Sequence, residues 1–378
     1  MSDPPLRILV IGSVTIDNIA VIGTQDIDRV TLHNGEKSYL LLEQGRKIDA
    51  ENISNHVGGG AANVAVSMAR QGFDVDILAL VGDDHNGETI RYKLNNEGVG
   101  LDYFITDPHS GTDSSILIYS HDQNAAIFTN RGANTYLSTY LDKVDFSNYH
   151  LVYIGCLSGS SYECFPVIVR QAKAAGCYVA TNPGIDQWTD HIEKFLSVAE
   201  KIDYLSLNKE ETIALLSQLA LSKKHTADIL LTPIKKSGVE VIPPLLESGL
   251  HVGGRMIPLR KAISTISHIG PTYFSLTDAM EGAYLFDGKA LLYCPSVDVT
   301  SWGTAGAGDA FASTIVAQLI KGHDPERALS AATQNAASVV EYVDTQTGLL
   351  TSDQIDRLAE NNILSNHVLL LGQQKYIG

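Results

Sequence analysis

Residues 303–311 read GTAGAGDAF, a run of small residues that leads directly into the apolar helical segment AFASTIVAQLI at 310–320. A phosphate-binding P-loop has the pattern G-x-x-x-x-G-K-[ST], and the spacing from Gly303 to Gly308 fits it. Asp309, however, stands where a P-loop has its lysine. The stretch therefore predicts an anion-binding loop at the start of a helix, followed by a carboxylate that needs its own explanation.

Two roles are open for Asp309. As a structural residue, it complements the positive end of the helix dipole. As a catalytic residue, it is a general base that takes the proton of an attacking hydroxyl during phosphoryl transfer. In that second role, the backbone N–H groups of Gly306, Ala307 and Gly308 form an anion hole for the transferred group. The carboxylate then faces the nucleophile while the loop faces the phosphate, which explains why the two stand together.

The composition limits the classes of protein and of partner. The 378 residues are 44% apolar and 19% charged, so the chain can bury a core as one large domain or two smaller ones. Its net charge of -16 argues against a nucleic-acid or anionic-membrane partner, because both would require a basic face. The four cysteines form no C-x-x-C pair, and no apolar run approaches the ~20 residues of a membrane span. With no signal-peptide pattern at the start, these features predict a soluble, cytoplasmic protein.

Short apolar strands alternate with helical segments along most of the chain. Strands are predicted at 6–11, 75–81, 151–155, 177–182 and 204–208, and helices at 61–70, 87–96, 167–176 and from 209 onward. This order predicts an α/β fold with a doubly wound, mainly parallel sheet and helices on both faces. Ligands of such sheets bind beyond the carboxyl ends of the strands, where we expect Asp17, Asn182 and Asn208.

Two regions interrupt this alternation. Residues 18–57 contain patchy strand-like pieces, and residues 112–129 read as a hairpin. We predict that lid segments at about 18–57 and 103–131 form a small β-sheet over the site. Residues 222–272 are irregular in composition and are predicted to be an insertion in a single domain that spans residues 1–378.

A second glycine cluster, HVGGGAAN at 56–63, leads into the helix predicted at 61–70. Glycines let a ligand approach the backbone closely, although a tightly packed turn would also explain them. Asn63 favours the binding role, because an amide in the first turn of a helix can bond a hydroxyl. An NAD-dependent oxidoreductase is disfavoured, because the G-x-G-x-x-G pattern is absent after the first strand at Gly12.

The two glycine segments, 58–63 (GGGAAN) and 303–309 (GTAGAGD), together resemble the two signatures of the ribokinase-like (PfkB) family of carbohydrate and nucleoside kinases. Shorter matches follow the order of the same family: Asp17 after Gly12, Gly132-Ala-Asn134 after the hairpin, and the N-x-x-E segment Asn208-Lys-Glu-Glu211. The resemblance covers nearly the whole chain apart from residues 222–272.

The resemblance implies an ATP-dependent, magnesium-requiring kinase that phosphorylates a primary hydroxyl of a sugar or sugar-like molecule. It implies the following roles: Asp309 as base; Gly306, Ala307 and Gly308 as anion hole; Asp17, Gly58, Gly59 and Asn63 as substrate ligands; Asn208, Thr277, Gly282 and Thr304 at the nucleotide; and Glu211 at Mg²⁺ through water. An N-x-x-E segment also has a purely structural interpretation, a capping box at the start of a helix.

Three positions depart from the family pattern. Gly303 stands where the family usually has an aspartate that contributes to a monovalent-cation site, which argues against activation by potassium. In the segment from Thr277 to Gly282, Ala279 replaces a glycine near the nucleotide. The segment Asn182-Pro-Gly184 lacks the usual charged pattern on the phosphate side.

Two alternatives to a sugar kinase stay open. A nucleoside kinase would need an apolar slot for the base, for which Tyr39, Phe128 and Tyr136 are candidates. A binding protein of the same fold that has lost turnover would explain Gly303 and Ala279. The resemblance also suggests a homodimer formed through the lid.

Overall fold

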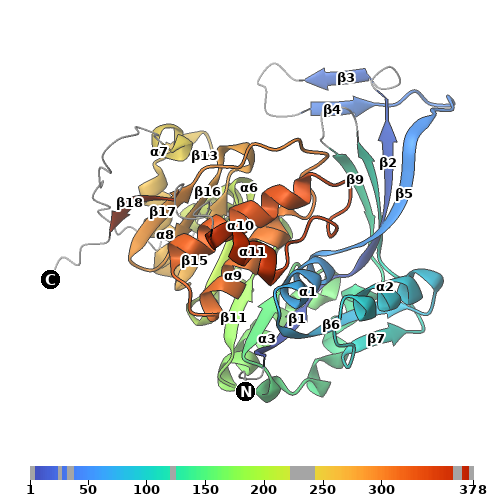
Figure 1. Cartoon of the computed structure of the whole chain (residues 1–378), viewed down its shortest axis with the longest axis horizontal. Coiled ribbons are helices and arrows are strands. Elements are labelled where there is room, and N and C mark those ends of the chain that lie inside the picture. Colours follow the sequence, from blue (N-terminus) through green and yellow to red (C-terminus); the bar gives the residue numbers. More distant parts are fainter. Residues whose placement is uncertain are drawn as a thin grey trace.

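A ten-stranded sheet lies at the centre of the computed structural model (Figure 1). The structure describes residues 5–23, 28–31, 38–119, 125–221, 243–360 and 368–373. The spatial order of the strands is β18 (Leu369–Gln373), β17 (Ala290–Cys294), β16 (Ala283–Phe286), β15 (Tyr273–Thr277), β12 (Tyr204–Asn208), β11 (Tyr178–Thr181), β10 (Leu151–Ile154), β1 (Arg7–Ile11), β6 (Asp74–Gly82) and β7 (Phe104–Asp107). The strands from β15 to β7 run parallel, and those from β15 to β18 are antiparallel.

Helices cover both faces of this sheet. Successive side chains of a buried strand point to opposite faces, so each strand contributes to two apolar clusters. In β1, Ile8 and Val10 belong to one apolar cluster, and Leu9 and Ile11 belong to the other. The first cluster includes side chains of α1 (Gly60–Arg70), α2 (His85–Asn96), α9 (Ala307–Ile320) and α10 (Pro325–Val340). The second includes side chains of α3 (Phe165–Ala174), α4 (Ile185–Thr189), α5 (Ile192–Leu196), α6 (Lys209–Leu221), α7 (Pro244–Ser248) and α8 (Leu259–Ile269).

Shorter elements complete the large domain. The 3₁₀ helices are η2 (Ala133–Lys143), η3 (Phe146–Asn148), η4 (Gly159–Cys164), η5 (Ala199–Lys201) and η6 (Ala279–Glu281), and β13 (Leu250–Val252) pairs with β14 (Arg255–Ile257). Helix α11 (Ser352–Glu360) packs through Ile355 against Ala331 of α10. In the part of the chain with assigned structure, no helix is long and apolar enough to cross a membrane.

A separate four-stranded sheet projects from the large domain as a lid (Figure 1). Its order is β5 (Ala50–Gly58), β2 (Thr15–Ile22), β8 (Ser114–Tyr119) and β9 (Ala125–Asn130), and the hairpin of β3 (Asp28–Thr31) and β4 (Ser38–Leu41) lies beyond it. Strand β2 follows β1 closely and β5 runs directly into α1, so the chain enters and leaves the lid beside the first glycine cluster.

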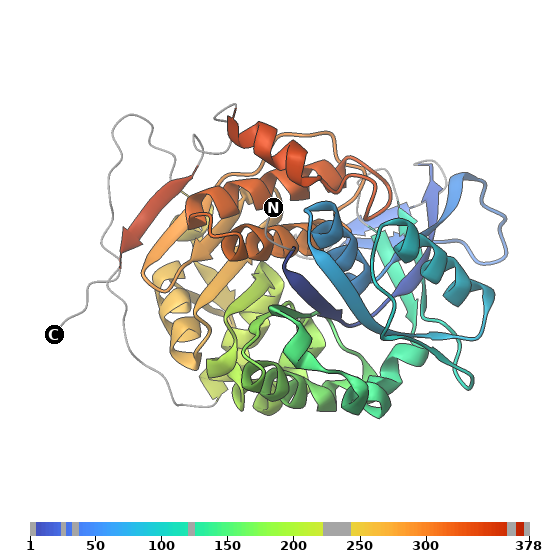
Figure 2. The same ribbon diagram turned by 60° about the horizontal axis from the view of Figure 1, so that its bottom comes forward.

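The predicted fold class is confirmed: a large, mainly parallel sheet lies between two layers of helices, next to a small separate sheet (Figure 2). One strand lies elsewhere than expected. Strand β7 begins at Phe104 and pairs with β6 at the edge of the large sheet, so the second lid segment starts after it rather than near residue 103. Of the predicted insertion, residues 222–242 lie outside the described residues.

Candidate active site

The lid strands β2 and β5 meet the large domain at two adjacent glycines. A side chain at Gly58 would overlap the carboxylate of Asp17, which lies on the neighbouring strand β2. Gly59 has a φ of 91°, and a Cβ there would lie 2.6 Å from the carbonyl oxygen of Ser13. Both approaches require the absence of a side chain. The glycine cluster therefore holds Asp17 close to the start of α1.

Asp17 is a buried carboxylate, 9% exposed, whose Oδ1 accepts a hydrogen bond of 2.9 Å from the hydroxyl of Thr15. Burial raises the pKa of Asp17, while hydrogen bonds from Thr15 and Ser115 and the charge of His56 act in the opposite direction. The sequence pattern placed Asp17 at the end of the first strand. It lies instead within β2, because a new strand begins at Thr15 after β1 ends at Ile11. A fixed, buried carboxylate suits the recognition of a hydroxyl group.

The two glycine motifs meet at a hydrogen bond between Asn63 and Asp309. The Nδ2 atom of Asn63 donates to Oδ2 of Asp309 over 2.8 Å, although the residues lie 246 positions apart. A Cβ at Gly60 would lie 3.4 Å from Oδ1 of the same carboxylate, so the backbone of α1 also approaches Asp309 closely. We expected Asn63 to bind a substrate hydroxyl. In this structure its amide N–H group holds Asp309.

The surroundings of Asp309 bring the pKa of its carboxyl group close to neutral pH. Burial raises the pKa of Asp309 to about 6; the hydrogen bond from Asn63 opposes this rise, and the negative charge of Asp17 adds to it. A base is most effective when its pKa lies near the working pH. Asp17 and Asp309 therefore interact, and the pKa of Asp309 lies close to neutral pH.

The loop before α9 leaves open space at one glycine and excludes side chains at another. Gly306 has a φ of 78°, and a Cβ there would lie 2.7 Å from Cβ of Thr345. Gly308 is different: among the described residues, nothing lies within 4 Å of the position that its Cβ would take. The protein itself therefore does not require glycine at 308. A bound group that approaches the helix start would explain it.

Asn208 and Glu211 form a capping box at the start of α6. The backbone N–H of Asn208 donates to Oε2 of Glu211, and that of Glu211 donates to Oδ1 of Asn208, each over 2.8 Å. The structural interpretation of N-x-x-E thus holds. Burial raises the pKa of Glu211 to about 7; the backbone hydrogen bond from Asn208 opposes the rise, and the charges of Asp309 and Glu210 add to it. Glu211 therefore lies within the electrostatic reach of Asp309.

Two of the predicted nucleotide residues are neighbours in the large sheet. Asn208 and Thr277 are partners in the parallel pairing of β12 and β15, at the carboxyl ends of both strands. Gly282 has a φ of 97°, and a side chain there would overlap the carbonyl oxygen of Cys294, so its backbone requires glycine. Thr304 is exposed in the loop before Gly306. Among the described residues, neither Gly282 nor Thr304 forms a hydrogen bond with the carboxylate of Asp309, which is held by Asn63.

A family model described as the pfkB family carbohydrate kinase matches residues 9–242 and 258–352 of this sequence. The chain belongs to this family. The match includes both glycine motifs and the N-x-x-E segment, and its gap at 243–257 falls within the predicted insertion. Members of the pfkB family are ATP-dependent kinases, so this chain is an ATP-dependent small-molecule kinase.

Ribokinases and a nucleoside kinase are among the proteins that resemble this pfkB family member. The ribokinase of Bacillus subtilis (strain 168) is 23% identical over 349 residues, which cover 90% of this chain and 99% of that protein. A crystal structure of ribokinase from Cryptococcus neoformans var. grubii serotype A in complex with ADP has a TM-score of 0.68, 20% identity, and coverage of 93% and 99%. A Burkholderia thailandensis nucleoside kinase in complex with inosine has a TM-score of 0.68, 15% identity, and coverage of 94% and 98%.

The acidic side chains of this pfkB kinase suit a metal ion that is held through water. Among the described residues, no three or more His, Cys, Asp or Glu side chains gather closely enough to hold a metal directly. The buried carboxyl of Glu211 nevertheless has a pKa of about 7, raised by burial and by neighbouring negative charge. Such a carboxylate would be stabilised by a nearby cation, and Mg²⁺ usually keeps several of its water ligands.

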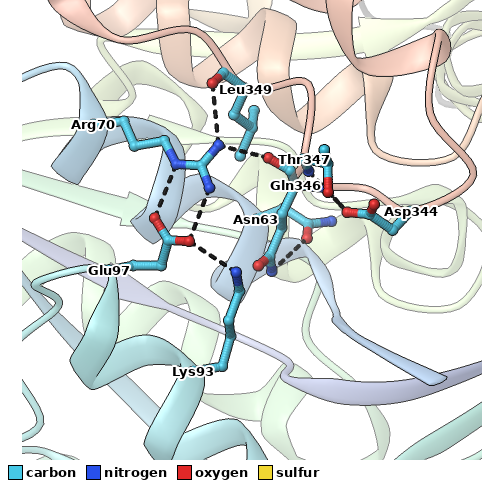
Figure 3. A network of polar contacts seen from close by, with 8 residues as sticks. All are labelled: Asn63, Arg70, Lys93, Glu97, Asp344, Gln346, Thr347 and Leu349. Atoms are coloured by element: carbon cyan, nitrogen blue, oxygen red, sulfur yellow. Dashed lines mark hydrogen bonds and ion pairs between the residues drawn. The ribbon is translucent and has the colours of Figure 1, made fainter.

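The sequence patterns missed a loop of this kinase that contacts Asn63. Thr345 and Gln346, between α10 and α11, both donate hydrogen bonds to its Oδ1. Figure 3 shows Gln346 beside Asn63 and Arg70 of α1 close to the same loop. The sequence around Thr345, VDTQTGL, has no motif that indicates a site. These contacts appear only after the chain has folded.

Proposed function

We propose that this kinase transfers the terminal phosphoryl group of ATP to a primary hydroxyl of a sugar or sugar-like molecule. The observation that carries the proposal is the position of Asp309. Its carboxylate lies at the start of α9, directly after the loop 306–308, is held by Asn63, and has a pKa of about 6. A base and an anion-binding loop are thereby adjacent in one short segment.

The proposed step uses four groups of this chain. Asp17 and the backbone of Gly58 and Gly59 hold the hydroxyls of the substrate. Asp309 accepts the proton of the attacking hydroxyl as its oxygen forms a bond to the terminal phosphorus. The bond from phosphorus to the leaving ADP oxygen breaks, and the N–H groups of residues 306–308 stabilise the negative charge on the transferred group.

The nucleotide is proposed to bind beyond the carboxyl ends of β12 and β15. Asn208 and Thr277 are partners there, and Gly282 and Thr304 belong to the two loops predicted to border it. Glu211 would organise a hydrated Mg²⁺, which when bound would neutralise the charge of the phosphates. Because no aspartate stands at Gly303, we propose that turnover does not require a monovalent cation.

The apolar face of the lid supports two further parts of the proposal. The lid would exclude water, so that ATP is not hydrolysed without an acceptor. A homodimer through the lid is supported by three exposed apolar side chains on one face of its sheet, Ile53, Ile116 and Phe128. A cytoplasmic location is supported by four free cysteines, Cys156, Cys164, Cys177 and Cys294.

A sugar acceptor is favoured over a nucleoside. A base would need an apolar slot, but Phe128 and Tyr136 are 60% and 51% exposed. Phe128 pairs with Ile116, on the face of the lid opposite to Asp17 and Ser115. The side chain of Tyr39, the third candidate, lies outside the described residues.

ADP release from ATP and Mg²⁺, measured across a panel of sugars and nucleosides, tests the proposed activity. We expect turnover with a sugar and no dependence on potassium; turnover only with a nucleoside would replace the proposal.

Asp309→Asn should lose on the order of 10²–10⁴ in kcat with unchanged ATP binding. The matched control is Asp324→Asn, the same change at the start of the neighbouring helix α10, where the side chain only caps the helix. Near-normal turnover of Asp309→Asn would show that Asp309 only complements the helix dipole.

A further inference from the structure

The loop between α10 and α11 is held rigidly on both sides. The Oδ1 atom of Asp344 accepts hydrogen bonds of 2.8 Å from the backbone N–H groups of Gln346 and Thr347. From the other side, Nη1 of Arg70 donates to the carbonyl oxygens of Gln346 and Leu349 over 2.7 and 3.1 Å (Figure 3). The hydrogen bonds from both sides therefore hold this loop in one position.

The anchor of this loop is itself fixed. Glu97 accepts two hydrogen bonds from Arg70, of 2.9 and 2.8 Å, and one of 2.8 Å from Lys93 (Figure 3). These bonds join α1 to α2 and hold the guanidinium toward the loop. Arg70 lies on the same helix as Asn63, so α1 carries both the anchor of the loop and the amide that the loop contacts.

The loop fixes the orientation of the Asn63 amide. The Oγ1 atom of Thr345 and the Nε2 atom of Gln346 donate to Oδ1 of Asn63 over 2.8 and 3.2 Å. If the amide were reversed, its NH₂ group would meet the NH₂ group of Gln346, and neither could accept. With Oδ1 held by the loop, Nδ2 must point the other way, toward Asp309.

Thr345 also contacts the anion-binding loop. A Cβ at Gly306 would lie 2.7 Å from Cβ and 3.0 Å from Cγ2 of Thr345, so the two residues pack backbone against side chain. Gly306 is the residue before α9, with a φ of 78°. Thr345 is buried and contacts both residues through different atoms: its hydroxyl bonds Asn63, and its Cβ and Cγ2 pack against Gly306.

We propose that Thr345 is a positioning residue for phosphoryl transfer. Its hydroxyl orients the Asn63 amide that holds Asp309, and its Cβ and methyl group pack against Gly306 and fix the position of that residue. This inference rests on the proposed function of Asp309 as the base. The hydroxyl and the methyl group can be removed separately, so the two contacts can be tested one at a time.

The ionisable groups around Asp309 must stay constant in such a test. The charge of Asp17 acts on Asp309 from β2. The charge of Asp309 in turn raises the pKa values of Tyr153 on β10, Cys156 just after that strand and Glu211 on α6. Substitution of Thr345 alters none of them. A change in the ionisation of Asp309 in these variants would therefore report on the bond from Asn63.

The test compares Thr345→Val, which removes the hydroxyl and keeps the packing, with Thr345→Ser, which keeps the hydroxyl and removes the methyl group. The readouts are kcat, KM for ATP and the pH profile of kcat/KM, with the best acceptor of the panel. For Thr345→Val we expect kcat to fall about tenfold and the acid limb to move upward by about one pH unit, as for a weakened hydrogen bond to a charged group. KM for ATP should not change. Thr345→Ser should keep the wild-type acid limb.

The outcomes separate this inference from the proposed function. If Thr345→Val has the kcat and the acid limb of the wild type, while Asp309→Asn is inactive, the inference about Thr345 is wrong and Asp309 remains the base. If both variants retain near-normal turnover, the role of Asp309 fails first. If Thr345→Ser shifts the acid limb as far as Thr345→Val does, the hydroxyl does not orient Asn63, which also overturns the inference.

Discussion

Ala279 is the one non-glycine residue with a positive φ, 46°, in the part of the chain that the structure describes. It occupies the position where the family pattern from Thr277 to Gly282 has a glycine. The left-handed conformation costs an L-residue about 1–2 kcal/mol, because Cβ crowds the following carbonyl oxygen. This kinase therefore carries local strain in a loop that is proposed to border the nucleotide.

Ala279→Gly should relieve that strain. We expect the free energy of unfolding to rise by about 1 kcal/mol, measured by chemical denaturation. The control is Ala175→Gly at an exposed position with a φ of -81°, where the same change should lower stability because glycine gains freedom in the unfolded chain. An Ala279→Gly variant that is no more stable than the wild type would contradict the idea of stored strain.

The raised pKa of Asp309 links activity to stability with opposite signs. Its folded-state pKa of about 6 lies above its ordinary value of 3.8, so the folded protein binds the proton more tightly than the unfolded chain. Stability from this group is therefore complete below the ordinary value and declines as pH rises through about 6. If Asp309 is the base, as proposed, activity requires its ionised form and is expected to rise over the same pH range.

Asp309→Asn should remove the pH-dependent part of this loss. We predict that the variant and the wild type melt at similar temperatures near pH 4, and that the variant melts higher at pH 8, although its turnover is lost. Thermal unfolding at a series of pH values measures the difference. A gap that stays constant from pH 4 to pH 8 would contradict the raised pKa, whatever the turnover.

The glycine motifs show which residues of the site a sequence can identify. The sequence marks Gly58 and Gly306 as positions without room for a side chain, and the structure agrees, because a Cβ at either would meet other protein atoms. Their roles at the substrate and at the phosphate stay predictions. Asp309 stands out because a negatively charged carboxylate directly after a predicted anion-binding loop is unexpected. Thr345 has no such local mark: its role depends on a contact with Asn63 across 282 positions, and nothing in its neighbours in sequence indicates that contact.

At the scale of elements, the lid packs against the loop that precedes α9. Ile19, Leu117 and Tyr119 form a small apolar cluster on the lid, with Ala305 of the loop and Val343 packed against it. A Cβ at Gly303 would lie 2.6 Å from Cε1 and 2.9 Å from the hydroxyl oxygen of Tyr119. With Tyr119 in this position, a side chain at residue 303 would collide with its ring, which fits the glycine found there.

Gly303→Ala should therefore disturb the contact between the lid and the loop. We predict at least a tenfold loss of kcat/KM, because either the lid or the loop before α9, the proposed anion hole, must move to make room for the methyl group. In the double variant Gly303→Ala/Tyr119→Leu, the shorter side chain should restore part of that loss. Steady-state kinetics of both single variants and the double variant measure the coupling. Independent, additive effects would show that Tyr119 does not constrain residue 303.

The alternation of strands and helices explains why the large domain is easier to predict than the lid. Strands such as β1 are buried on both faces and read as continuous apolar runs. In the lid, β5 is AENISNHVG, a polar segment with exposed residues that gains its structure from pairing with β2. Strand β7 is short and contains no signal that distinguishes the edge of the large sheet from the lid.

At the scale of the whole molecule, the lid leaves one apolar face uncovered. Ile53, Ile116 and Phe128 are 72%, 52% and 60% exposed, and the strand register puts all three on the face opposite to Asp17. The chain has a net charge of -16, so copies repel one another in general and need a specific apolar contact to associate. Clustered exposed apolar side chains are typical of such contacts.

We predict that this kinase is a dimer that buries the outer faces of two lids against each other. The variant Ile116→Asn/Phe128→Asn should be a monomer at concentrations where the wild type is a dimer, because burying two amides without partners would cost more than the contact gains. Light scattering coupled to size-exclusion chromatography measures the mass. The control is Tyr92→Asn on α2, which removes an apolar side chain that is 71% exposed outside the lid and should leave the dimer intact. A wild-type protein that is monomeric, or a double variant that keeps the mass of a dimer, would contradict this prediction. If the double variant is a monomer and also has a raised KM for the acceptor, pairing of the two lids contributes to binding of the acceptor.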